Sequence, residues 1–240
     1  MSELDAVATD LAPTGTLRAA INVGNPVLAQ GDPADPRGVT VDLARRLGEE
    51  LGLPVELTGF TAARQSFEAL RDGAADLCFL AVDLTRAVEV AFTPPYVVIT
   101  GVFVVADDSP IGSASEVDRS GVRVGVKEGS AYDLHLSREL RHAEVVRGSD
   151  GVTVFAEQGL EVGAGIRQPV QAWADARGGM RVLEPEFMQI RQAVGIPVGR
   201  AEPTKAYVTG FVERAIADGF VAEALRRSGQ DETLVAKPVE

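Results

Sequence analysis

The spacing of apolar residues changes along this chain, and each change predicts a new strand or helix. Leu17 to Val23 is a short apolar run before a turn signal, Gly24-Asn25-Pro26, as expected of a strand. Apolar residues then recur every four positions with charges between them, which predicts an amphipathic helix: Leu43, Leu47 and Leu51. Gly52 ends this helix and Pro54 follows it. The fold therefore opens with a strand followed by a helix.

Strands and helices continue to alternate over the rest of the chain. A second strand begins at Val55, a short helix covers Ser66–Arg71, and a third strand, Leu77–Val82, is apolar on both faces. This order is typical of right-handed βαβ units in a mainly parallel sheet. A second series follows, with strands at Gly101–Val105, Val122–Val126 and Leu160–Ile166 and helices from Ala131, at Val152–Gln158, Val170–Ala176, Ala206–Ala217 and Val221–Arg227. We predict an α/β protein.

The same pattern divides the chain into two lobes. Residues 15–97 with 194–240 are expected to form the first lobe and residues 101–190 the second, with hinge crossings near 96–100 and 188–193. Residues 1–14 are expected to be a loose lead-in and Gly31–Arg37 a loop. Ligands of open α/β sheets bind at the carboxyl ends of strands. Four clusters follow strands and are expected to face one cleft: Gly24–Leu28, Phe79–Arg86, Glu128–Tyr132 and Arg167–Gln168.

The composition restricts the classes of partner, metal and cofactor that we expect this protein to bind. The 240 residues include 23 basic and 35 acidic side chains, a net charge of −12, which argues against nucleic acid or an anionic membrane face as the main partner. Cys78 is the single cysteine, so no intramolecular disulfide can form, and its apolar strand predicts a buried, inert thiol. His135 and His142 are the two histidines, and we expect both on a solvated surface and no metal site. We predict no cofactor, since phosphate-binding glycine motifs are missing.

The sequence contains no membrane-inserting segment. No run approaches the ~18 apolar residues of a transmembrane helix. Residues 1–8 lack the basic and apolar regions of a secretory signal, so the sequence as written leaves a cytoplasmic location open.

Arg86 is the strongest candidate for ligand binding. It follows the apolar strand Leu77–Val82 after a short turn, where a guanidinium can clamp a small carboxylate with two parallel hydrogen bonds. The alternative is a surface arginine paired with Glu89. The strand order and this arginine predict a small anionic ligand held in a local basic pocket.

Several segments in order resemble the family-3 solute-binding proteins of amino-acid ABC importers, which have the type II periplasmic-binding fold. The similar segments are Gly38-Val39-Thr40-Val41-Asp42-Leu43-Ala44, Gly73-Ala74-Ala75-Asp76-Leu77, Arg86-Ala87-Val88-Glu89-Val90-Ala91-Phe92-Thr93-Pro94-Pro95-Tyr96 and Val124-Gly125-Val126-Lys127-Glu128-Gly129-Ser130. The resemblance covers roughly Leu17 to Gly229. It implies two lobes with two hinge crossings, an ABC permease as partner, and a periplasmic or extracellular location.

The resemblance also assigns roles to individual residues. The arginine that matches Arg86 grips the ligand α-carboxylate in that family. Backbone amides of a strand end and of a helix start assist it; carried over, these belong to Phe79, Leu80 and Ala81 in the first lobe and to Ser130 and Ala131 in the second. This implies an amino acid or another carboxylate-bearing solute as the ligand.

Departures from the family pattern leave the second half of the site open. The family usually places an aspartate in the second lobe to bind the ligand ammonium, and this sequence has Ile166, Arg167 and Gln168 there. Arg167 is either a second cation, which would suit a dicarboxylate, or a solvated loop arginine. Asp83 could hold Arg86, receive an amine, or simply form an Asx turn.

Aromatic stacking on the ligand is also altered. Asn25 and its neighbours occupy the stretch where the family places an aromatic residue, so stacking would come from Phe79, Phe60 or Tyr132. The alternative for Tyr132 is a place in the helix core.

Binding by hinge closure is the function that the sequence favours. One alternative is an enzyme similar to cyclohexadienyl dehydratase, which shares this fold and needs a buried neutral acid, with Glu128 or Glu161 as the candidates. Another is a cytoplasmic ligand-sensing module.

Overall fold

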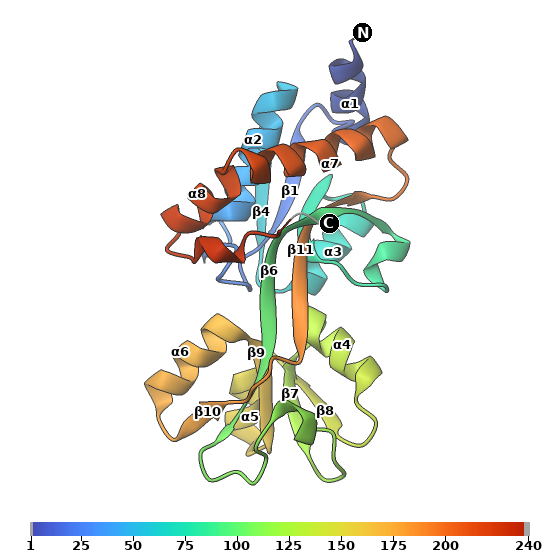
Figure 1. The fold of residues 1–240 in the computed structure, drawn as a ribbon. Helices are drawn as coiled ribbons and strands as arrows, with labels where there is room; N and C mark the ends of the chain where they lie inside the picture. The colour runs from blue at the N-terminus through green and yellow to red at the C-terminus, as the bar shows by residue number, and fades with distance from the viewer. Residues whose placement is uncertain (1, 238–240) are drawn as a thin grey trace. The chain divides into compact units, whose positions relative to one another are not determined.

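The structure is a computed structural model that describes residues 2–237, and its chain divides into two compact units. Unit 1 comprises the described parts of residues 1–98 and 191–240, and unit 2 comprises residues 99–190. Two strands continue from one unit into the other: β6 (Val90–Ala106) and β11 (Met188–Pro197) (Figure 1). The predicted hinge crossings, 96–100 and 188–193, therefore fall inside strands. The α/β class is confirmed in both units.

The strands of unit 1 form mainly parallel pairs. Its strand order is β4 (Val55–Phe60), β1 (Leu17–Asn22), β5 (Leu77–Ala81) and then β11. β1 runs parallel to both β4 and β5, whereas β11 pairs antiparallel to β5, with Gln192 opposite Ala81. The prediction of a mainly parallel sheet is confirmed here. β5 is buried along its whole length, as its apolar sequence requires.

A buried carboxylate fixes the start of β5. Asp76 is 0% exposed and accepts hydrogen bonds from the backbone N–H of Arg18 at 3.1 Å, its Nε at 2.9 Å and its Nη2 at 2.7 Å. Arg200, three residues beyond β11, reaches the same carboxylate at 3.4 Å. One side chain therefore joins β1, β5 and the segment after β11.

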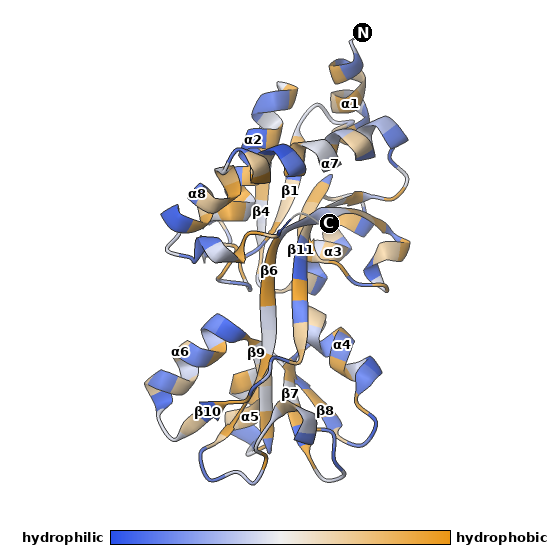
Figure 2. Cartoon of the chain, viewed as in Figure 1, coloured by the Kyte–Doolittle hydropathy of each residue, from blue (hydrophilic) through white to orange (hydrophobic). Residues whose placement is uncertain are grey.

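The helices of unit 1 are α1 (Glu3–Leu11), α2 (Val39–Leu51), α3 (Ala63–Arg71), α7 (Glu202–Ala217) and α8 (Phe220–Arg227). The prediction for α2 is confirmed: its three leucines are buried, and Gly52 ends it with φ 65°. Each helix places its apolar residues on the protein side, so Figure 2 shows hydrophilic and hydrophobic segments alternating along it.

Two sequence predictions for unit 1 are wrong. The expected lead-in, residues 1–14, contains helix α1, whose first turn is capped by a capping box of Ser2 and Asp5. The buried residues of α1 are Val7, Ala8 and Leu11, and the helix packs against α2 and α7. The expected loop at 31–37 contains a hairpin of β2 (Gln30–Asp32) and β3 (Asp35–Arg37). Both elements are short, and neither carries a long apolar period.

The strands of unit 2 form both parallel and antiparallel pairs, within the same hydrogen-bonded sheet as those of unit 1. β7 (Arg123–Lys127) pairs in parallel with β8 (Glu144–Gly148) and β9 (Val162–Ile166), while β6 pairs antiparallel with β9 and with β10 (Met180–Val182). Its helices are α4 (Ala131–Glu139), α5 (Gly151–Gln158) and α6 (Arg167–Arg177). Sequence reasoning found β7, β9 and the three helices but missed β8 and β10. Neither missed strand has a fully buried position: β8 mixes exposed and half-buried residues, and all three residues of β10 are half-buried.

The Asp76 contacts predict a large effect on stability. Replacing Asp76 by Ala should lower the free energy of unfolding by about 3–5 kcal/mol, because Arg18 and Arg200 lose a buried carboxylate that they both contact. Urea unfolding measures this. As a matched control, Asp72→Ala removes an exposed aspartate that pairs with Arg71, and it should cost far less, because solvent screens an exposed ion pair. Equal costs would show that the Asp76 contacts do not stabilise unit 1.

Candidate functional site

The candidate site in unit 1 lies at the carboxyl end of β5. Phe79, Leu80 and Ala81 are buried there. β5 pairs with β1 through Leu77 and Cys78, and its pairing with β11 continues as far as Ala81. The last residues of β5 thus extend beyond its pairing with the parallel strand β1, at the carboxyl end of β5. Such a place is where open α/β sheets bind ligands.

Arg86 returns to this strand end from the short helix η1 (Arg86–Val88). It is only 3% exposed, and its Nη1 donates a hydrogen bond to the carbonyl oxygen of Ala81 at 3.3 Å. Burial lowers the pKa of the Arg86 guanidinium, while the negative charge of Asp83 opposes that shift. The alternative of a surface arginine paired with Glu89 is wrong. The chain has placed a desolvated cation at the end of its site strand.

Asp83 forms the turn that leads to Arg86. It is 7% exposed, and its Oδ1 accepts a hydrogen bond from the N–H of Thr85 at 2.8 Å. Its backbone carbonyl accepts another from Ala87 at 2.9 Å. The Asx turn expected for Asp83 is therefore present, and the same carboxylate supplies a negative charge that favours the charged form of Arg86.

The remaining unit 1 candidates have local structural roles. Asn25 is buried, and its Oδ1 accepts a hydrogen bond from the N–H of Val27 at 3.3 Å, which shapes the turn after β1. Phe79 packs edge-on against Tyr96, with ring centroids 6.1 Å apart. Because the ring of Phe79 is enclosed in this way, it is a poor surface for ligand stacking. Phe60 is half-buried.

The candidate site in unit 2 begins at the start of α4. Ser130 is its N-cap, and the Ser130 Oγ accepts a hydrogen bond from the N–H of Asp133 at 3.0 Å. Asp133 is buried and accepts from the N–H of Gly129 at 2.8 Å and from Arg147 Nε at 3.1 Å. The chain's own side chains thus satisfy part of this helix start, next to the half-buried first residue, Ala131.

Two places were expected for Tyr132, stacking on the ligand or the core beneath the helix, and its burial favours the core. It is buried, and burial raises the pKa of its hydroxyl group. Sequence reasoning missed the neighbouring Lys127, a half-buried residue at the carboxyl end of β7. Burial lowers the pKa of Lys127, and the charge of Asp150 opposes this. Its position at the end of a predicted strand was the available signal.

Arg167 is held by acidic residues of its own unit. It begins α6 directly after β9, and its Nη1 and Nη2 contact both carboxylate oxygens of Glu184 at 2.6 and 2.9 Å. Its Nη2 also lies 3.6 Å from Glu186, and its Nε donates to Thr100 Oγ1 at 3.2 Å. These hydrogen bonds hold the pKa of Glu184 below its usual value. Arg167 is thus neither a solvated loop arginine nor a cation without a counter-ion.

Gln168, the neighbour of Arg167, has a buried polar atom. Its Oε1 has no hydrogen-bond partner among the described residues. An acceptor in this state has the capacity to receive a donor from a ligand or a water molecule.

Neither of the two acids considered for a dehydratase is buried. Glu128 is exposed. Glu161 lies just before β9, and the hydrogen bonds from Arg123, at 2.8 to 3.0 Å, hold its pKa below the usual value. Within residues 2–237, no group of three or more His, Cys, Asp or Glu side chains is arranged to hold a metal ion. No described helix combines the length and apolar character needed to span a membrane.

Solved structures with the same arrangement of elements are solute-binding proteins of the type II periplasmic-binding fold. The family model for bacterial extracellular solute-binding proteins, family 3, matches residues 17–230. The chain belongs to this family, and the predicted resemblance is confirmed. A comparison with curated protein sequences gave no match.

Three similar structures are amino-acid-binding proteins by name. The solute receptor for L-cysteine of Neisseria gonorrhoeae has a TM-score of 0.76 and 20% identity over 93% of this chain and 93% of that one. AbpA of Streptococcus pneumoniae, an amino acid ABC transporter substrate-binding protein bound to L-arginine, has a TM-score of 0.74 and 15% identity over 95% and 99%. AncCDT-1, an ancestral amino acid-binding protein and precursor of cyclohexadienyl dehydratase, has a TM-score of 0.73 and 21% identity over 94% and 99%. At these identities the likeness is one of fold.

The single cysteine, Cys78, lies in β5 and can report whether this strand is folded. Cys78 is buried, and burial raises the pKa of its thiol to about 12. A thiol reagent should therefore fail to label the folded protein near neutral pH and should label one thiol per chain in denaturant. Absorbance of the released thiolate measures this, with Cys78→Ala as the blank. Rapid labelling under native conditions would mean that β5 opens easily.

Proposed function

We propose that this chain binds an amino acid or a related organic acid through its carboxylate, and that Arg86 is the clamp. The supporting observation is the burial of the Arg86 guanidinium at the carboxyl end of β5. A desolvated guanidinium binds a carboxylate through two parallel, charge-assisted hydrogen bonds, which are stronger than neutral ones. Backbone amides of Phe79, Leu80 and Ala81, and that of Ala131 at the start of α4, would supply further donors; the N–H of Ser130 already donates to the carbonyl oxygen of Lys127 at 3.1 Å.

The charges around Arg167 favour a ligand that also carries a cation. With Glu184 and Glu186, Arg167 forms a group of one positive and two negative charges, so the group is net −1. A second carboxylate on the ligand would meet a guanidinium that two glutamates already neutralise. An ammonium group would instead meet a surplus negative charge. We therefore favour an amino acid over a dicarboxylate.

Ligand binding is proposed to close the two units by a hinge motion. β6 and β11 carry the chain between the units, so backbone rotations near 96–100 and 188–193 would move one unit against the other. A ligand held by Arg86 in unit 1 and by residues of unit 2 would favour the closed state, because only that state makes both sets of contacts.

The wider role that we propose is delivery of the ligand to an ABC permease outside the cytoplasmic membrane, in keeping with the extracellular description of the family. The dehydratase alternative has less support, because Glu128 is exposed and Glu161 is ion-paired with Arg123. A general acid in such a mechanism has to be held neutral by burial.

A thermal-shift screen of amino acids and organic acids tests the carboxylate clamp. A ligand at 100 times its Kd should add about 2.7 kcal/mol of stability. For a chain of this length that corresponds to roughly 5–10 °C in Tm. The amide derivative of the same amino acid, which lacks the carboxylate, should give no shift.

Variants then locate the clamp. Arg86→Met should abolish the shift, and Arg86→Lys should weaken binding by at least about tenfold, because an ammonium group cannot form the bidentate contact. Arg71→Met, which removes an exposed arginine of unit 1, is the matched control and should leave the shift unchanged. Circular dichroism confirms that each variant is folded. A full shift in folded Arg86→Met would rule out the clamp.

A further inference from the structure

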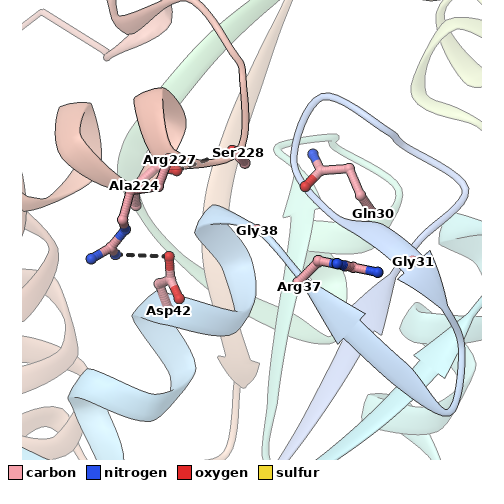
Figure 3. A pocket seen from close by; sticks show the side chains of 8 residues that line it. All are labelled: Gln30, Gly31, Arg37, Gly38, Asp42, Ala224, Arg227 and Ser228. Carbon is pink, nitrogen blue, oxygen red and sulfur yellow. Dashed lines mark hydrogen bonds and ion pairs between the residues drawn. The ribbon is translucent and has the colours of Figure 1, made fainter.

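A groove with a local excess of positive charge lies in unit 1, away from Arg86. It is formed by the β2–β3 hairpin, the first turns of α2 and the end of α8, and its volume is about 490 Å³ (Figure 3). That volume lies within the range of small-molecule sites in proteins. The lining residues used below are Gln30, Gly31, Arg37, Gly38, Asp42 and Arg227.

The two guanidinium groups of this groove differ in their partners. Arg227 Nη2 donates to Asp42 Oδ2 at 3.0 Å, so these two charges offset each other, as Figure 3 shows. Arg37 is exposed and has no ion-pair partner among the described residues. The groove therefore has a net charge of +1 in a chain whose net charge is −12.

Bare backbone forms part of the wall beside Arg37. Gly31 and Gly38 both have positive φ, 94° and 116°, and both line the groove. A Cβ at Gly31 would lie 3.4 Å from Arg37 Nε, and one at Gly38 would lie 2.8 Å from Gln30 Oε1. Backbone lies closer still, with Asp35 O at 2.7 Å from the first of these Cβ positions and Leu28 O at 2.6 Å from the second, so the chain packs too tightly here for a side chain.

A second hollow of about 380 Å³ adjoins the first. The two share Asp42 and Arg227, and the second adds Arg45, which is exposed and has no ion-pair partner among the described residues. Arg46 lines it as well, with its guanidinium 4.6 Å from the ring centroid of Phe220. Glu49 also lines this hollow, and Arg46 pairs with Glu50 and Asp218, so Arg45 is the one lining cation there without an ion-pair partner among the described residues.

We propose that this groove is a second binding site, for a small anion that carries a carboxylate or phosphate group, and that Arg37 is its main contact. The site is independent of the Arg86 clamp and of the proposed transport role. Asp42 limits affinity, since it neutralises Arg227 and repels an anion. Gln30 is not assigned as a donor to the anion, because its Nε2 already donates to the carbonyl oxygen of Pro26 at 2.5 Å.

Amide NMR titration of the full chain tests the proposal with two probes, inorganic phosphate and succinate, at constant ionic strength. We expect both probes to shift the amides around Gly31, Gly38 and Arg227, whether or not succinate also shifts amides at the Arg86 site. Because the probes differ in chemistry, their relative affinities show whether the site prefers phosphate or carboxylate. Shifts that are absent, or spread evenly over exposed arginines, would mean an adventitious ion only and would overturn the proposal.

Three variants sharpen the test. Arg37→Gln should weaken binding by at least about tenfold. Asp42→Asn should strengthen it, since it removes a negative charge and frees Arg227 from its ion pair. Arg64→Gln, at another exposed arginine of unit 1, is the matched control and should have no effect. Unchanged binding in Arg37→Gln, or weaker binding in Asp42→Asn, would contradict the assignment.

Discussion

The buried carboxylate of Asp76 is the contact on which the site strand depends. It takes three hydrogen bonds from Arg18 and one from Arg200, and it sits immediately before β5. β1 and the segment beyond β11 are thereby tied to the same point. The far end of β5 is where Arg86 returns to donate to Ala81. A network at one end of a short strand thus helps to fix the register of the groups at its other end.

The two candidate cations differ in how their charge is compensated. Arg86 is almost fully buried beside Asp83, and burial works against its charge. Arg167 is partly exposed and forms a bidentate pair with Glu184. Removing a guanidinium from water is costly unless hydrogen bonds and anions return the lost interactions. Arg86 therefore incurs a larger desolvation cost than Arg167, whose contacts with Glu184 hold two segments of unit 2 together.

Sequence patterns predicted the elements whose signals are local. α2 has apolar residues every four positions and ends at a glycine, so the helix and its last residue were predicted; β5 is an uninterrupted apolar run, predicted one residue too long. Arg86 was chosen as a candidate because it follows this strand. The partners of Arg167 were missed, because Glu184 and Glu186 lie 17 and 19 residues away with no periodic relation to it. Their contact exists only through tertiary folding, as does the burial of Lys127.

Helix α1 has a consequence for how the protein can be shortened. The family match starts at residue 17, so it leaves α1 out. Yet Asp10 Oδ2 accepts hydrogen bonds from the N–H of Ala201 and the hydroxyl of Thr204, at 3.0 and 2.6 Å, where α7 lacks a capping side chain of its own. A fragment cut at the family boundary would leave the first turn of α7 without these acceptors and uncover the apolar surface under Leu11. Such a fragment would be prone to aggregate, although it would retain every residue of the Arg86 site.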